Sequence, residues 1–291
     1  MNITLALGGG GAKGNSHIGV IRRLEREGFK IEAIAGTSFG GIVAVFYALG
    51  YTPGQIEEIF ASLDQTQLYG YSPNEGPSLL GLAGATTWLN EVIGERTFDD
   101  LKMPCALTAA DLKSGHKVIL SEGPLVDAML ATIAIPGIFP ARHIGDLELV
   151  DGGTLDPVPV ATARSLISSK LPVVAVVLTT PMGVPAQAWE IPLPDYIPRN
   201  LLGRLSKMRY TQALDVFLRS LDMVTRAVTE YRLEVDKPEI IIRPQVTDID
   251  ILEHVDVHEV VRKGEEAVEA LLPELYELFA WQNRIRRAIG V

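Results

Sequence analysis

A serine on a tight glycine turn is the strongest chemical feature of the sequence. Residues 36–40 read Gly-Thr-Ser-Phe-Gly, a G-x-S-x-G pattern between a run that predicts a strand and a periodic segment that predicts a helix. There the turn exposes the Ser38 hydroxyl, and the start of the helix favours negative charge beside it. In isolation the pattern also fits an ordinary serine N-cap. In this context it predicts a nucleophile elbow made of Gly36, Thr37, Ser38, Phe39 and Gly40.

A glycine-rich loop precedes this turn. It reads GGGGAKG and follows the predicted strand at residues 3–8. Because one helix joins the first two strands, a right-handed crossover makes them parallel and brings both carboxyl ends to one edge of the sheet. Backbone N–H groups beside an exposed nucleophile are what a tetrahedral oxyanion requires. We therefore expect an oxyanion hole among Gly9, Gly10, Gly11, Ala12, Lys13 and Gly14.

The same loop also fits the G-x-G-x-x-G pattern of a dinucleotide site. Such a site needs an acidic residue at the end of the second strand, where this chain has Ser38 instead, and Glu32 lies at that strand's start. Lys13 is followed by Gly14 and not by the Ser or Thr of a P-loop. A nucleotide-binding enzyme is therefore the weaker alternative.

An aspartate at the end of a later predicted strand is the candidate base. Asp151 opens the segment DGGTLDPVPV, so Gly152 and Gly153 let the backbone approach the carboxylate closely. Alone, such a residue is more typical of an Asx turn. Because an ordinary aspartate is only weakly basic, Asp151 can serve Ser38 only in a dry, hydrogen-bonded site.

The chain does not follow the order of an ordinary α/β-hydrolase, in which the nucleophile comes after several strands and a late histidine completes a triad. Ser38 follows only the second predicted strand. His254 and His258 come late, but they lie in the polar stretch ILEHVDVHEV and are interpreted as solvated helix residues. Asp151 is thus the predicted partner of Ser38.

The elements that must position these residues alternate between strand and helix patterns, which predicts a parallel sheet covered by helices. Strands are expected at 3–8, 31–36, 103–110, 116–120, 147–150, 172–179 and 239–243, with a hairpin turn at Gly115. Helices are expected at 15–27, 38–50, 124–133, 159–169 and 203–233, and from about 257 onward. The fold class is therefore α/β, a three-layer α/β/α arrangement with a mostly parallel central sheet, in one domain spanning 1–291.

Two segments lack a firm period and are candidate walls or lids of a substrate cavity, although core packing explains them equally well. The first is a partly helical insertion at 62–100, and the second is the proline-rich loop within 181–200. Their large apolar side chains are Leu79, Leu80, Leu82, Trp88, Leu89, Trp189, Tyr196 and Ile197.

Composition excludes several classes of protein. The chain is 47% hydrophobic, yet no apolar run approaches the roughly 18 residues that span a bilayer. A single cysteine, Cys105, excludes an internal disulfide, and the absence of HExxH spacing argues against a metal site. A net charge of -10 argues against nucleic acid and against anionic lipid. With no signal-peptide pattern at its start, the chain is expected to be cytoplasmic.

Taken together, these motifs resemble the patatin-like phospholipases, serine acylhydrolases with a Ser-Asp dyad. LALGGGGAKGNSHIGVIRRLEREG resembles the family's oxyanion strand and helix, AIAGTSFGG its nucleophile elbow, LVDGGTLDPVPV its aspartate turn, and ATIAIPGIFPA the segment before that turn. The likeness covers residues 3 to about 180, and EIIIRPQV with the last helix resembles the ending of small bacterial members.

The resemblance implies a patatin-like fold and a carboxylic ester hydrolase of lipid metabolism. It makes Ser38 the nucleophile, Asp151 its base, and the N–H groups around Gly10, Gly11 and Ala12 the oxyanion hole. It also implies that Lys13 braces the loop, although the residue alone could be solvated. His17 is interpreted as a helix residue and not as a third catalytic member. No metal or organic cofactor is implied.

Several alternatives stay open. The substrate could be a phospholipid, a lysophospholipid, a neutral ester or a thioester, cleaved by water or transferred to another alcohol. A low-turnover lipid-binding or regulatory protein on the same fold is the competing function. Thr154 and Asp156 after the DGG turn, and the 62–100 insertion, leave substrate choice open. The C-terminal helix, with arginines at Arg284, Arg286 and Arg287, is expected to pack on the sheet, with transient membrane contact as the alternative.

Overall fold

The computed structural model describes residues 1–72, 75–184 and 209–280. Across these residues it has an eight-stranded sheet in the order β5-β6-β3-β2-β1-β7-β8, with β4 paired to β3 outside this path. The strands are β1 (Asn2–Leu7), β2 (Lys30–Thr37), β3 (Cys105–Asp111), β4 (Lys117–Leu120), β5 (Arg142–Ile144), β6 (Leu147–Asp151), β7 (Val173–Val176) and β8 (Ile240–Ile242).

The predicted mostly parallel sheet is confirmed. β3, β2, β1, β7 and β8 are neighbours and parallel, so their carboxyl ends share one edge. β4, β5 and β6 pair antiparallel at the other end of the sheet. The β3–β4 hairpin is present, with Gly115 at φ 71 in its turn. The short strand β5 was not predicted, because three residues are too few to show a period.

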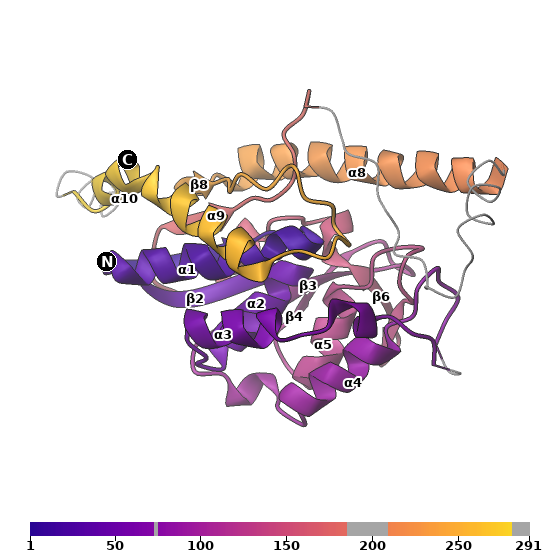
Figure 1. Ribbon diagram of the computed structural model, residues 1–291. Coiled ribbons are helices and arrows are strands. Elements are labelled where there is room, and N and C mark those ends of the chain that lie inside the picture. The colour runs from indigo at the N-terminus through magenta and orange to yellow at the C-terminus, as the bar shows by residue number, and fades with distance from the viewer. Residues whose placement is uncertain (73–74, 185–208, 281–291) are drawn as a thin grey trace.

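Helices cover both faces of the sheet. In β1, Leu5 and Leu7 belong to a core shared with α1 and α2, while Ala6 belongs to a second core with residues of α6 and α8. Figure 1 shows α8 along one side of the molecule and α3 and α4 on the opposite side. The helices are α1 (Ser16–Arg26), α2 (Phe39–Ala48), α3 (Pro53–Ala61), α4 (Ala83–Val92), α5 (Leu125–Thr132), α6 (Val160–Ser165), α8 (Arg209–Asp236), α9 (Val257–Glu269) and α10 (Leu272–Glu277).

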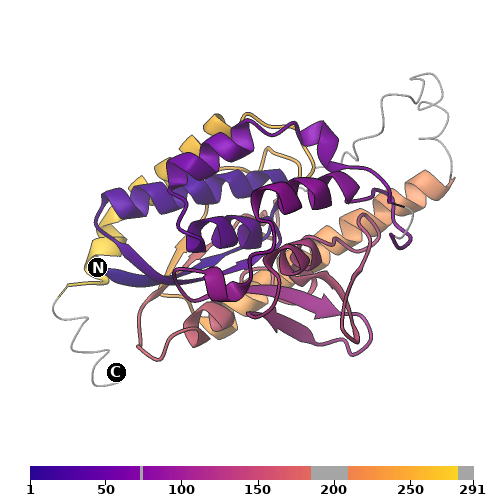
Figure 2. The same cartoon turned by 90° about the horizontal axis from the view of Figure 1, so that it is seen from below.

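The C-terminal helix corrects one expectation. It was expected to pack on the sheet, but α9 packs on α1 and α3, as Figure 2 shows. Two glycines allow the close crossing: a Cβ at Gly19 would lie 1.9 Å from the Val261 carbonyl oxygen, and a Cβ at Gly264 would lie 1.9 Å from the Ser16 carbonyl oxygen. The apolar stripe of α9 is therefore buried by helices. The arginines at 284, 286 and 287 lie outside the described residues.

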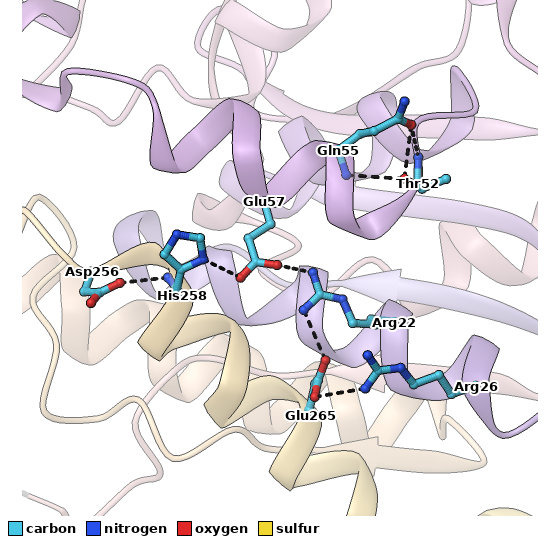
Figure 3. Close-up of polar contacts among 8 residues, drawn as sticks. All are labelled: Arg22, Arg26, Thr52, Gln55, Glu57, Asp256, His258 and Glu265. Carbon is cyan, nitrogen blue, oxygen red and sulfur yellow. Dashed lines mark hydrogen bonds and ion pairs between the residues drawn. The ribbon is translucent and has the colours of Figure 1, made fainter.

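Charged side chains tie α9 to its two neighbours at the surface (Figure 3). Glu57 of α3 lies between His258 of α9, 2.7 Å from its Nδ1, and the Arg22 guanidinium of α1. Arg22 also pairs with Glu265 of α9 at 3.2 Å, and Arg26 pairs with the same carboxylate at 3.4 Å. His258 therefore has a structural role, pairing α9 with α3.

The 62–100 insertion is partly helical, as predicted. It contains α4 and two short 3-10 turns, Gln65–Leu68 and Phe98–Asp100. Backbone bonds join it to the segment before the aspartate turn, since the Leu79 N–H donates to Gly137 and the Leu80 N–H to Ile138. Among the described helices, none combines the length and the apolar character needed to cross a membrane.

Candidate active site

Ser38 stands in a strained turn between β2 and α2. Its backbone has φ 55 and ψ -131, a region that residues with a side chain rarely adopt and that is often found at functional sites. The flanking glycines are needed sterically, because a Cβ at Gly36 would lie 2.4 Å from the Gly40 carbonyl oxygen and one at Gly40 would lie 2.5 Å from the Leu7 carbonyl oxygen. The predicted elbow geometry is present.

Thr132, which the sequence analysis did not identify, accepts a hydrogen bond from the backbone of the elbow. The Ser38 N–H donates to Thr132 Oγ1 at 2.9 Å, and the Thr132 hydroxyl donates to the Thr108 carbonyl at 2.7 Å. Thr132 ends α5 and is fully buried. It lies in the segment ATIAIPGIFPA, whose resemblance to the family gave no role to a single side chain. α5 thus holds the serine's backbone in place.

Asp151 ends β6 and lies within hydrogen-bonding reach of Ser38. Its Oδ1 accepts a bond from the Gly153 N–H at 2.7 Å, the Asx-like turn that the sequence suggested. Asp151 is 6% exposed, and this burial raises the pKa of its carboxyl group to about 6, against the opposing effects of hydrogen bonding from the Ser38 side chain and the Gly153 N–H. The carboxylate is therefore buried and hydrogen-bonded, two conditions that a basic aspartate requires.

The glycine loop lies beside the serine. A Cβ at Gly9 would lie 3.1 Å from Ser38 Cβ. Two N–H groups of the predicted set already have carbonyl partners, since Gly9 donates to Pro157 at 3.0 Å and Ala12 donates to Ile251 at 2.8 Å. Among the described residues, no such acceptor is found for the N–H groups of Gly10 and Gly11. These two are thus the donors best placed for an oxyanion.

The remaining loop residues begin a 3-10 turn, Gly11–Asn15, which leads into α1. His17 in the first turn of α1 is fully buried, and its Nε2 bonds the Gly8 carbonyl oxygen at 2.8 Å. Burial lowers its pKa to about 4, against that bond, so the ring is neutral near pH 7 and its Nε2–H donates to the loop. His17 thus braces the loop from within a helix, away from the carboxylate of Asp151.

Lys13 is not a solvated lysine. It is half-buried, and this burial lowers its pKa, while the carboxylates of Asp222 and Asp250 oppose that shift. Asp222 comes from α8 and pairs with Arg226 at 2.8 Å. Lys13 therefore lies in the wall of a partly enclosed space next to the loop.

Two cavities flank Ser38. The first, of about 150 Å³, is almost entirely apolar and lies under α3 and α4. The second, of about 90 Å³, is more polar and contains Asp151, Gly10, Gly11 and Lys13 in its wall. Ser38 lines both. The apolar cavity is lined by, among others, Phe39, Phe60, Leu82, Trp88, Leu89 and Phe139.

The residues that line the two cavities can be compared with the predicted wall residues. Of the predicted wall residues, Leu82, Trp88 and Leu89 do line the apolar cavity, while Leu79 and Leu80 do not. Those at 189, 196 and 197 lie outside the described residues. Neither cavity is lined by a histidine. The described residues also hold no group of three His, Cys, Asp or Glu side chains placed for a metal ion.

Asp156, one of the two residues noted after the DGG turn, contacts residues of neighbouring strands. Its buried carboxylate pairs with Lys117 of β4 at 2.8 Å, and its carbonyl accepts a bond from the Thr37 hydroxyl at 2.8 Å. Thr37 Oγ1 also lies 2.7 Å from Thr108 Oγ1. This network joins β2, β3, β4 and the aspartate turn beneath the site.

Several known proteins are similar to this chain. An uncharacterised NTE family protein of Mycobacterium tuberculosis is 34% identical over 160 residues, which cover 55% of this chain and 44% of that protein. A second one from the same species is 28% identical over 279 residues, covering 93% of this chain and 46% of that protein. Lysophospholipase NTE1 of Saccharomyces cerevisiae is 27% identical over 180 residues, covering 56% and 10%. The chain thus spans less than half the length of these relatives.

Among solved structures, VipD from Legionella pneumophila has the same fold, with a TM-score of 0.55 and 14% identity over 93% of this chain and 66% of that one. Residues 5–164 match the model of the patatin-like phospholipase family, and this range contains the glycine loop, the elbow and the aspartate turn. The chain therefore belongs to the patatin-like phospholipase family.

Proposed function

We propose that this chain is a serine acylhydrolase that cleaves fatty-acyl esters of lipids with a Ser38–Asp151 dyad. The observation that carries the proposal is the placement of Ser38 and a buried carboxylate, Asp151, in the wall of one cavity, where burial raises the pKa of the carboxyl group to about 6. A base with a pKa near the working pH is effective in proton transfer. A carboxylate that served only an exposed Asx turn would not need this burial.

In the first half-reaction, the Ser38 oxygen attacks the ester carbonyl while its proton moves to Asp151. The N–H groups of Gly10 and Gly11 stabilise the oxyanion, and the start of α2 favours the negative charge. When the intermediate collapses, the bond to the alcohol breaks and Asp151 returns the proton to the leaving oxygen. The acyl group then remains on Ser38 as an ester.

In the second half-reaction, water replaces the alcohol. Asp151 takes a proton from the attacking water, and the collapse of the second intermediate releases the fatty acid and restores the Ser38 hydroxyl. No step requires a metal ion or an organic cofactor.

The two cavities give the substrate a direction. The acyl chain is proposed to lie in the apolar cavity, where Trp88 and Phe60 remove it from water. The alcohol side faces the polar cavity, whose wall includes Lys13, Thr154 and Thr180. A phosphate ester in the leaving group would meet the Lys13 side chain there. The yeast relative's name, a lysophospholipase, agrees with this class of substrate.

A panel of esters of graded acyl length, with and without a phosphate headgroup, tests the proposal. Wild-type protein is expected to cleave them, and Asp151→Asn to lower kcat/KM by about 10²–10⁴-fold because general base catalysis is lost. Asp146→Asn removes an exposed carboxylate from the β5–β6 turn and is the matched control. Equal activity of the Asp151→Asn variant and the control would contradict the dyad.

A further inference from the structure

Four apolar side chains from two distant parts of the chain are exposed near the cavities. Tyr71 and Leu79 of the insertion are 64% and 39% exposed, and Val216 and Phe217 of α8 are 56% and 50% exposed. We call these four residues the apolar rim. Single exposed apolar residues are common, but a group of large ones from separate elements marks an interaction site.

The rim is joined at Gly137. The Leu79 N–H donates to the Gly137 carbonyl at 3.1 Å, and Phe217 Cε1 lies 3.7 Å from the position of a Cβ on Gly137. The Tyr71 hydroxyl donates to the Leu79 carbonyl. Gly137 directly follows Ile135 and Pro136, which line the Ser38 cavities. The rim therefore adjoins the segment that lines both cavities at Ser38.

Exposed apolar side chains occur along most of α8, at Val216, Phe217, Met223, Val224, Tyr231 and Val235. The rim includes the two of them that lie nearest the start of the helix. Asp222 and Thr225, near the middle of α8, line the polar cavity, while at the far end of the helix Arg164 donates to the Asp236 carbonyl close to the start of β7. Figure 1 shows α8 running along the molecule from the side of β6 and α4 to the side of β8 and α10. The part of α8 that carries Val216 and Phe217 is thus on the side of the candidate site, while Tyr231 and Val235 are at the opposite end of the helix.

The charges beside the rim indicate its partner. Asp215 and Arg219 pair at 2.6 Å on the same turns of α8, so their charges cancel locally. The chain as a whole carries -10, which repels an anionic surface. A second copy of the chain seated on the rim would cover the approach to Ser38. A neutral, apolar partner that contains the substrate avoids both the electrostatic repulsion and the loss of access to Ser38.

We infer that the apolar rim docks onto a zwitterionic lipid surface and brings the approach to Ser38 against the membrane interface. Aromatic and aliphatic side chains that enter the interface supply affinity by burying apolar area. An acyl chain can then pass from the lipid layer into the apolar cavity without crossing water. This inference rests on the proposed function, because it gives the lipid ester a route to the dyad.

Flotation with phosphatidylcholine vesicles tests the inference, with Ser38→Ala in every protein so that lipid is not consumed. Val216→Ser/Phe217→Ser is expected to weaken binding by about tenfold or more, from the apolar area lost. The matched control is Tyr231→Ser/Val235→Ser, which removes side chains that are 65% and 53% exposed at the other end of the same helix. Phe217 and Val235 are about 27 Å apart along α8, and the control should bind like the parent.

Adding the anionic lipid phosphatidylglycerol to the phosphatidylcholine vesicles should weaken binding of the parent protein, because the chain carries a net charge of -10. The inference is overturned if the parent does not bind phosphatidylcholine vesicles, if the rim variant and the control bind equally, or if the rim variant changes only the oligomeric state in size-exclusion chromatography. With Ser38 restored, both variants should hydrolyse a short, water-soluble ester like wild type. Failure of every protein to do so would count against the proposed function and leave the vesicle result to decide the docking.

Discussion

Ser38 and Asp151 meet across a strand to which neither belongs. In β3, Thr108 pairs with Thr37 of β2, and the next residue, Ala109, pairs with Asp151 of β6. The serine and the aspartate therefore leave two different neighbours of β3 at the same level and on the same edge of the sheet. Because the pairing register fixes this arrangement, the proposed dyad is positioned by the sheet more than by its loops.

The first prediction concerns the pH dependence of catalysis. Asp151 must be ionised to accept the Ser38 proton, and its pKa is raised to about 6 by burial. We expect kcat/KM for an uncharged ester to rise with pH through about 6 and to level off above it, since the free enzyme's base controls this parameter. A profile that is flat between pH 5 and 8 would contradict the role of Asp151.

The second prediction is that ionisation of the buried Asp151 lowers the free energy of unfolding. A carboxyl group whose pKa is higher in the folded than in the unfolded chain favours folding at low pH, and this contribution is lost as pH rises through the folded pKa. For Asp151, with an unfolded value of about 3.9, the cost of ionisation above pH 6 is on the order of 2–3 kcal/mol.

Asp151→Asn removes this cost while its amide oxygen can still accept the Gly153 N–H. The variant should therefore melt at a higher temperature than wild type at pH 8, and the difference should shrink at pH 4. Asp146→Asn, at an exposed position, should show no such pH-dependent gain. If Asp151→Asn melts below wild type at both pH values, burial is not what perturbs the carboxylate.

The third prediction concerns the close approach of the glycine loop to the nucleophile. In Gly9→Ala the new Cβ would lie 3.1 Å from Ser38 Cβ, so one of them must shift. We expect a fall in kcat with a small change in melting temperature, because misplacing a reacting group is costly to rate. Gly54→Ala in α3, where no atom lies within 4 Å of the new Cβ, is the control and should retain full activity.

The fourth prediction tests the apolar cavity. Each methylene of an acyl chain buried there contributes about 0.8 kcal/mol, so kcat/KM should rise roughly fourfold per carbon until the cavity is filled. Ala85→Leu adds carbons to the cavity wall and should end this rise at a shorter chain. Thr87→Leu, at an exposed position of the same helix, should leave the chain-length profile unchanged. Identical profiles for the two variants would place the acyl chain elsewhere.

Much of this arrangement could be predicted from local patterns. The elbow and the aspartate turn are short motifs whose glycines are required by contacts within a few residues or with the adjacent strand, as at Gly36 and Gly40. The order of strands and helices then follows from periodicity, and the right-handed crossover places the glycine loop and Ser38 at one edge.

The parts that could not be predicted depend on contacts between distant segments. Nothing local marks Thr132 as the acceptor of the Ser38 N–H, or Ile251 as the acceptor that occupies the Ala12 N–H. The docking of α9 on α1 is of the same kind, although Gly19 and Gly264, each inside a helix, were a signal of close helix packing that the apolar pattern of α9 overshadowed.

The central claim is that Ser38 is a nucleophile activated by Asp151, and covalent labelling with a fluorophosphonate tests it most directly. Peptide mapping by mass spectrometry should find one adduct, on Ser38, in wild-type protein. Ser38→Ala should remain unlabelled, and Asp151→Asn should be labelled far more slowly than Asp146→Asn. An unlabelled wild-type protein, or an adduct on another residue, would contradict the account and favour a lipid-binding protein on the same fold.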